Sequence, residues 1–412
     1  MIWSVFRFPK KKVFHAPWEK LLDALIVILA GGTAMSELET RIRPDPAVQL
    51  AFGHAPCAHS SEIQRLLTAC TQEQVSPLCA GNQQLYQQYG RARSHDFSQS
   101  LLMLDLDLTG LLTSKHAEGS AKGYFANHVG HYGRQLCRII ATSYDEILWQ
   151  ALLPGNTLSQ ATLKPAIQQA QTILDLSADT RRQTVLRWDA GFGTDKNINW
   201  MLSQGYQIVG KMYAHTRVAK LARMVTEWRP TLTSPGRELG LVPQPHRYAR
   251  KTQQYVIRTP KKRPKNTWAY GVLVTTLPHT SPDEIVAWYD ARGGGIETDF
   301  RSDRQGLGLA KRRKQGMAGQ QMLLYLAERA HNLLSWTAHK LGPPLDQYGM
   351  LRLVRDAFQI NGYVLVMSDH IVEIGLNRHH PLAYAVRDGF NQLLGPKPLL
   401  KVWEPIDYIK EH

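Results

Sequence analysis

The spacing of hydrophobic positions changes near residue 100. Before that point apolar side chains recur at helical spacing, as Ile63, Leu66 and Leu67 do. Residues 17–19 can begin a helix over residues 21–30, and Ser60 can cap another. We therefore expect a helical N-terminal domain over residues 1–97.

From residue 98 the pattern is typical of alternating strands and helices. Residues 101–109 begin as an apolar run and end in alternation, which predicts a buried central strand. The elements predicted after it are strands at 134–142 and 146–153, a helix at 164–176, a strand at 184–188, a helix at 197–204 and a strand at 206–212. This β-β-β-α-β-α-β order predicts an α/β layer with three antiparallel strands first and crossover helices afterwards.

The remaining chain divides into three segments. Residues 213–280 are β-prone and include a predicted hairpin whose strands are 253–259 and 267–276. Helical spacing returns over 281–340, with a long helix at 317–341. The last segment, 341–412, mixes short strands at 363–367 and 371–375 with a helix at 382–394.

Charge narrows the choice of partner. The chain has 49 Lys and Arg against 34 Asp and Glu, a net charge of +15, and its pI is about 9.6. This balance favours a polyanion such as nucleic acid over an anionic membrane surface. The N-terminal domain is then expected to bind DNA, as a helix-turn-helix-like module, although a helical packing domain has the same pattern.

Other compositional features point to the cytoplasm. Hydrophobic residues make up 43% of the chain, which excludes a largely disordered protein. Four irregularly spaced cysteines without CxxC spacing do not indicate a disulfide framework. The most apolar stretch, residues 21–30, is too short to cross a membrane. We expect a cytoplasmic, nucleoid-associated protein without a membrane partner.

Acidic residues lie where predicted strands end and helices begin. Asp107 is near the end of the first strand, with Asp105 two residues earlier on the same face. Asp189 closes the fourth predicted strand, and Glu297 follows three glycines at a helix start. Singly, each is also consistent with a solvated edge, a turn former or a favourable helix-dipole contact. Together they suit hard divalent cations, which require several converging carboxylate oxygens. Asp299 and Asp303 are second choices at other helical angles.

The sequence around these residues resembles a known family. The ordered motifs are Leu-Asp-Leu-Asp-Leu-Thr-Gly at 104–110, Arg-Trp-Asp-Ala-Gly-Phe-Gly at 187–193 and Tyr-Asp-Ala-Arg-Gly-Gly-Gly-Ile-Glu at 289–297. This set resembles the DDE transposases of bacterial insertion sequences. It is most similar to the cut-and-paste group, which has a β-rich insertion between the second Asp and the Glu. Residues 213–280 fit that insertion, and the likeness extends over roughly residues 100 to 340.

The resemblance implies an RNase H-like (retroviral-integrase-like) catalytic domain built from residues 98–212 and 281–340. Asp107, Asp189 and Glu297 would hold two Mg²⁺ or Mn²⁺ ions. Asp105 is the alternative to Asp107, which is preferred because the family's first Asp precedes a Thr by two residues, as Asp107 precedes Thr109. Residues 341–412 would supply dimer or DNA contacts.

The resemblance also implies residues that bind DNA. Tyr289, Arg292 and Glu297 match a Tyr-Arg-Glu-Lys series that grips transposon-end DNA, although the Arg-to-Glu spacing is one residue longer and Arg304 stands where a Lys is expected. The aromatics Trp228 and Trp268 are candidates for stacking an extruded base or for core packing. Further basic candidates, which a solvated surface also explains, are Arg301, Arg304, Lys311, Arg312, Arg313 and Lys314 after the Glu and Lys261, Lys262 and Arg263 in the hairpin loop.

The activity implied is transposition of an insertion sequence by a homodimer bound to double-stranded DNA. Water activated by metal ions would hydrolyse phosphodiester bonds at the element ends, and the freed 3′-hydroxyl would attack target DNA. Two alternatives remain at this point. One is an RNase H-like nuclease without strand transfer, and the other is a transposase-derived DNA-binding protein that has lost catalysis.

Overall fold

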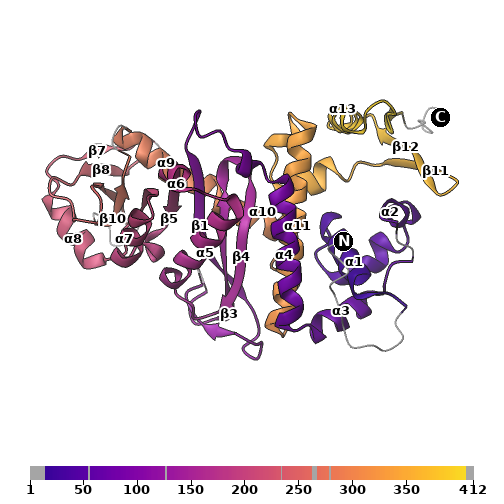
Figure 1. The fold of residues 1–412 in the computed structure, drawn as a ribbon, viewed down its shortest axis with the longest axis horizontal. Helices are drawn as coiled ribbons and strands as arrows, with labels where there is room; N and C mark the ends of the chain where they lie inside the picture. The colour runs from indigo at the N-terminus through magenta and orange to yellow at the C-terminus, as the bar shows by residue number, and fades with distance from the viewer. Residues whose placement is uncertain are drawn as a thin grey trace, which may run out of the picture. The chain divides into compact units, whose positions relative to one another are not determined.

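The computed structural model describes residues 14–53, 56–125, 128–232, 234–261, 267–277 and 280–404 (Figure 1). The chain folds into two compact units. We call one the sheet unit, Gly90–Leu112 with Ala121–Thr298, and the other the helical unit, Met1–Tyr89, Thr113–Ser120 and Asp299–His412. In the described part of the chain, no helix is long and apolar enough to cross a membrane.

The first half of the sheet unit has the predicted element order. The long strand β1 (Leu102–Leu112) pairs antiparallel with β3 (Tyr132–Ala141), which pairs antiparallel with β4 (Glu146–Pro154). On its other side β1 runs parallel to β5 (Thr184–Trp188), and β5 runs parallel to β6 (Gln207–Lys211). The intervening helices are α5 (Ser159–Leu174), α6 (Ala178–Arg182) and α7 (Asp195–Ser203). The expectation of an α/β layer is therefore confirmed.

The β-rich segment after residue 212 continues the same sheet. It contains α8 (His215–Met224), β7 (Arg229–Pro230), β8 (Glu238–Leu241), β9 (Gln253–Pro260) and β10 (Trp268–Thr275). The predicted hairpin is present as β9 and β10, and β10 pairs antiparallel with β6. With the short strand β2 (Ala121–Lys122), the order is β2-β3-β1-β5-β6-β10-β9-β8-β7, and β4 pairs with β3. The segment thus supplies the strand that covers the edge of β6.

Helix α9 (Pro282–Gly294) packs on this extended part of the sheet. It begins with a capping box in which Ser281 accepts from the Glu284 amide, followed by a proline at the first helical position. Its Ile285, Val286 and Tyr289 join a core cluster with residues of β5, β6, β8, β9 and β10. Helix α10 (Ile296–Gly306) follows after Gly295 alone.

The helical unit is organised around one long buried helix. Helix α11 (Met317–Leu341) has the predicted bounds and packs beside α4 (Gln72–Tyr89) (Figure 1). The other helices include α1 (Pro17–Leu29), α2 (Pro46–Ala51), α3 (Ser60–Ala69) and α13 (Ala383–Leu394). A small sheet has the order β11 (Gly362–Met367), β12 (His370–Asn377), β13 (Leu400–Trp403). The hydrophobic pattern predicted α1, α3, α11, α13, β11 and β12.

Candidate active site

Three acidic side chains from distant parts of the sequence lie near one another in the sheet unit. Asp107 lies on β1, Asp189 directly follows β5, and Glu297 is in the first turn of α10. The parallel register that pairs Asp105 with Arg187 brings Asp107 and Asp189 to the same edge of the sheet. The charges of Asp189 and Glu297 both raise the pKa of Asp107, so the three carboxylates are close enough to repel one another.

Asp107 has an environment that disfavours its charged form. Burial, and then the repulsion from Asp189 and Glu297, raise its pKa to about 7 against the opposing attraction of Arg292. The Arg292 Nη2 atom is 3.7 Å from Asp107 Oδ2, and the Leu108 amide donates to Oδ1 at 2.8 Å. At this distance the guanidinium makes no hydrogen bond with Asp107, and its attraction does not offset the effect of burial on the carboxyl.

Asp105 has a different environment although it lies only two residues away. Its carboxylate is completely buried and accepts two hydrogen bonds from Arg187, Nε to Oδ1 at 2.6 Å and Nη2 to Oδ2 at 2.7 Å. The Thr142 hydroxyl donates a third, at 2.7 Å. Arg187 also donates to the Trp288 carbonyl at 2.5 Å, which links β5 to α9. The Asp105 carboxylate is therefore engaged on both oxygens.

The turn after β5 fixes Asp189. Its Oδ1 accepts from the Gly191 amide at 2.9 Å, an arrangement that favours the turn. The turn lies directly against the end of β6, where Trp188 Nε1 donates to the Lys211 carbonyl at 3.1 Å. A Cβ at Gly193 would lie 1.8 Å from that carbonyl oxygen, so the close approach requires glycine there.

Tyr289 and Arg292 lie three residues apart on α9, as predicted. Arg292 is only 2% exposed, and its Nη2 donates to the Leu106 carbonyl at 3.3 Å. Its guanidinium carbon is 5.7 Å from the centroid of the Tyr289 ring, and burial raises the pKa of that phenol to about 12. Asp290, which follows Tyr289 on α9, accepts a hydrogen bond from Arg237 Nη1 at 3.0 Å. This bond joins the β-rich segment to α9.

Lys211, which the sequence analysis did not select, belongs to this site. It is the last residue of β6, and the pairing of Trp188 with Gly210 sets it beside Asp189. Its ammonium lies 4.7 Å from the centroid of the Tyr289 ring. Burial lowers the pKa of Lys211, and the nearby Asp189 charge opposes this shift. The available signal was a lysine near the end of the predicted strand 206–212, which follows the strand that ends at Asp189.

The basic residues predicted after Glu297 do not form one surface stripe. Helix α10 ends at Gly306, so the last four of them lie in the connection to α11. Arg301, Lys311 and Arg313 are exposed, and Arg304 and Lys314 are half-buried. Arg312 is buried and donates to the carbonyls of Leu307 and Gly32, so its prediction as a surface cation is wrong. Its guanidinium instead satisfies main-chain oxygens in the core of the helical unit.

Other predicted residues have identifiable surroundings. Lys261 is exposed, whereas Lys262 and Arg263 lie outside the described residues. Asp299 and Asp303, the second choices for the acidic cluster, are buried against His331 Nδ1 at 3.4 and 2.9 Å. Trp228 and Trp268 are half-buried, and the Arg258 guanidinium lies over both rings, at 4.1 and 4.5 Å from their centroids.

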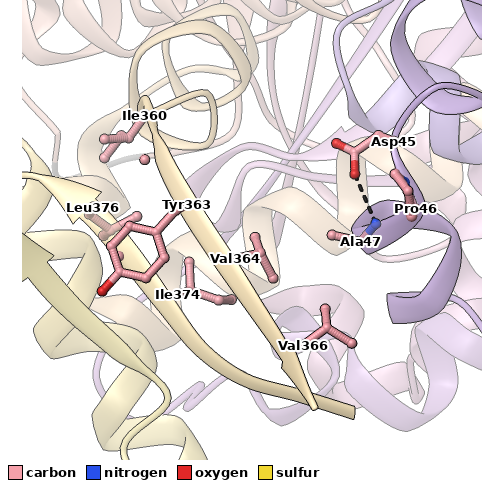
Figure 2. Close-up of a pocket in the computed structure, with 11 residues that line it drawn as sticks. Asp45, Pro46, Ala47, Ile360, Tyr363, Val364, Val366, Ile374 and Leu376 are labelled. Atoms are coloured by element: carbon pink, nitrogen blue, oxygen red, sulfur yellow. Dashed lines mark hydrogen bonds between the residues drawn. The ribbon is translucent and has the colours of Figure 1, made fainter. Parts of the chain in front are cut away.

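A separate pocket of about 520 Å³ lies in the helical unit (Figure 2). Its walls are the start of α2, at Asp45 and Ala47, and the β11–β12 hairpin, including Tyr363 and Val364. Asp45 is the one carboxylate among its lining residues, and its Oδ1 accepts from the Ala47 and Val48 amides at 3.0 and 3.1 Å. Asp45 thus serves as the N-cap of α2, and most of the other lining residues are apolar.

The acidic cluster of the sheet unit is suited to divalent metal ions. Asp107, Asp189 and Glu297 offer only oxygen donors, as hard cations such as Mg²⁺ require. Burial is the main cause of the raised pKa of Asp107, and the charges of Asp189 and Glu297 add to it; a bound cation would offset this repulsion. These residues therefore fit the ions that the sequence motifs imply.

Comparison with known proteins identifies the class. The chain belongs to the family described as transposase DDE domain group 1, whose profile matches residues 3–395. Members of a DDE transposase family are metal-dependent enzymes that cut DNA. One similar solved structure is the cryo-EM structure of the piggyBac transposase synaptic complex with hairpin DNA, at 12% identity and a TM-score of 0.46, covering 85% of this chain and 73% of that chain. A search of curated proteins gives no match.

Proposed function

We propose that this protein is the DNA transposase of an insertion sequence. In this proposal, Asp107, Asp189 and Glu297 hold two Mg²⁺ or Mn²⁺ ions, and the enzyme hydrolyses phosphodiester bonds at the element ends before joining the 3′-hydroxyl to target DNA. The observation that carries it is the convergence of these three carboxylates at one edge of the sheet, with Asp107 influenced by both others.

The strand arrangement supports an RNase H-like catalytic domain. Three antiparallel strands, β1, β3 and β4, precede two parallel additions, β5 and β6. We assign this domain to residues 98–212 and 281–340, with 213–280 as its insertion. Residues 1–97 are assigned to DNA binding, and residues 341–412 to dimer or DNA contacts.

The residues of the site have separate tasks in this mechanism. Asp107 serves as the first metal ligand because its carboxylate is incompletely neutralised, whereas both oxygens of Asp105 accept hydrogen bonds. Bound divalent ions supply activation of water and stabilisation of charge on the attacking and leaving oxygens. Arg292 orients Asp107, and the Tyr289 ring lies beside the Arg292 guanidinium. Exposed Arg301, Lys311, Arg313 and Lys261 are available for contacts with phosphates.

The functional assembly in this proposal is a homodimer on double-stranded DNA, acting in the cytoplasm at the nucleoid. The net charge of +15 supports the DNA partner, because a surface with excess Lys and Arg attracts the phosphate backbone regardless of sequence. Dimerisation allows two element ends to be held together.

Cleavage of a labelled duplex that carries the element ends tests the proposal. Wild type is compared with Asp189→Asn and Glu297→Gln in Mg²⁺ and in Mn²⁺, and Asp179→Asn, an exposed carboxylate on α6, is the matched control. We expect metal-dependent nicking that falls at least about 10³-fold in both site variants while DNA binding persists. The control should nick like wild type.

Two outcomes would replace the proposal with another function. Tight binding of the end duplex without cleavage by wild type in either metal would indicate a DNA-binding protein that lacks catalysis. Nicking without joining of the 3′ ends to a supercoiled target would indicate a nuclease without strand transfer.

A further inference from the structure

In the part of the chain that the structure describes, Lys211 forms no ion pair, although the charges of Asp189 and Asp290 both act on its ammonium. Among the described residues, none forms a salt bridge or a hydrogen bond with Lys211 Nζ, and its recorded contact is the Tyr289 ring at 4.7 Å. The side chain is half-buried between this ring and Gly271, where an added Cβ would lie 3.6 Å from Lys211 Cε. Packing thus holds the side chain in place, and no described protein group accepts a hydrogen bond from its ammonium.

The two cations of the site are placed differently. The Arg292 guanidinium is enclosed, lies 3.7 Å from Asp107 and donates to the Leu106 carbonyl. Both of these contacts are with residues of β1. Lys211 also lies close to the Tyr289 ring, but its ammonium forms no hydrogen bond or ion pair with the described residues. An ammonium that is partly removed from water without an acceptor has lost hydration, and an anionic ligand would restore this interaction.

We propose that Lys211 is a DNA-contacting residue of this site, binding a phosphate of the DNA strand whose end lies at Asp107, Asp189 and Glu297. This inference rests on the proposed function, since it is that function which brings a phosphodiester to this edge. The β5–β6 register supports it, because the pairing of Trp188 with Gly210 sets Lys211 directly alongside Asp189. A phosphate held by Lys211 lies next to the bond to be cut.

The salt dependence of DNA binding tests the contact without any catalysis. Binding of the end duplex is measured in EDTA from 50 to 200 mM salt for wild type, Lys211→Met and Lys211→Arg. The matched control is Lys220→Met, an exposed lysine on α8. Each phosphate contact contributes about 0.9 to the slope of log K against log[salt]. We expect Lys211→Met to lose about this amount, and Lys211→Arg and Lys220→Met to retain the wild-type slope.

Nicking separates this inference from the proposed function. With Mg²⁺, we expect Lys211→Met to require about tenfold more DNA for half-maximal nicking, and Lys211→Arg to restore most of this loss. An unchanged salt slope in Lys211→Met, with nicking like wild type, would overturn the role of Lys211 and leave the transposase proposal intact. If Lys211→Met has a reduced salt slope but wild type does not nick, the contact of Lys211 with DNA is supported and the transposase proposal is overturned. Thermal unfolding of each variant verifies the fold, and Lys211→Gln replaces Lys211→Met if the latter unfolds.

Discussion

Two carboxylates two residues apart on β1 have opposite electrostatic surroundings. Asp105 is completely buried and receives three hydrogen bonds, two of them from the Arg187 guanidinium. Asp107 lies 3.7 Å from the nearest guanidinium atom and is repelled by Asp189 and Glu297. Around Asp105 the charge is balanced within the protein, and around Asp107 it is not.

Asp105 thus belongs to a structural ion pair, whereas Asp107 belongs to a group of carboxylates whose repulsion a bound cation would reduce. The Asp105–Arg187 pair joins β1 to β5 and, through the Trp288 carbonyl, to α9. It therefore fixes the relative positions of the elements that carry Asp107, Asp189 and Arg292. The neighbouring carboxylates are held close together although they repel, so the folded protein pays an electrostatic cost that a bound cation would remove.

The largest expected effect is the loss of folding stability when the Asp105 carboxylate is removed. Asp105→Ala leaves the Arg187 guanidinium buried without its carboxylate, which should reduce the free energy of unfolding by about 3–5 kcal/mol. Urea denaturation measures this change. The double variant Asp105→Leu with Arg187→Met should recover most of the loss, because it leaves no unpaired charge. Equal losses in Asp105→Ala and Asp107→Ala would show that the two carboxylates are not different in kind.

Removing the charge of Asp107 should instead increase the free energy of unfolding, by an amount that depends on pH. Its pKa in the folded protein is about 7, above the unfolded value of 3.8, so its ionisation destabilises the fold as the pH rises through this interval. Metal-free Asp107→Asn should therefore be more stable than wild type by about 2–4 kcal/mol at pH 8 and similar to it near pH 4. Chemical denaturation at both pH values tests this sign. A variant less stable than wild type at pH 8 would contradict it.

A smaller effect is expected at Gly295, which joins α9 to α10 and lies close to Asp105. An added Cβ at Gly295 would lie 2.8 Å from Thr142 Cγ2 and 3.0 Å from Asp105 Oδ2. Gly295→Ala should lower the free energy of unfolding by about 1–2 kcal/mol by displacing these groups. It should also slow nicking, since Glu297 is two residues away. Gly294→Ala is the matched control, because a Cβ there meets no atom within 4 Å. Similar thermal unfolding and nicking in the two variants would exclude the close contact.

Much of the fold could be predicted because burial imposes regular spacing. The apolar run at 101–104 indicated the central strand β1, and the long apolar face at 317–341 gave α11 its observed bounds. The strand that carries Asp107 and the strand that ends before Asp189 were both predicted, and β1 and β5 are neighbours in the sheet. These inferences depend on patterns that lie within single segments or on general rules of connection.

The contacts that distinguish one charged residue from another could not be predicted in this way. Arg187 is buried against a carboxylate, and Arg312 is buried against main-chain carbonyls. The spacing of residues within one segment predicts neither partner. The same holds for Lys211, whose relation to Tyr289 depends on how α9 packs on β6. The pairing of β10 with β6 is likewise a long-range choice that a hairpin pattern does not specify.

The dispersal of the three carboxylates along the chain has a consequence during synthesis. Residues 107 and 297 are separated by 190 residue steps, and β6 obtains its neighbour β10 only when residue 275 is available. At about 5–20 residues per second, the ribosome needs roughly 10–40 s to cover that distance. Until residue 297 has emerged, a nascent chain carries at most two of the three carboxylates, and until residue 275 has emerged the edge of β6 lacks its strand. The complete acidic cluster thus forms only after about three quarters of the protein has been translated.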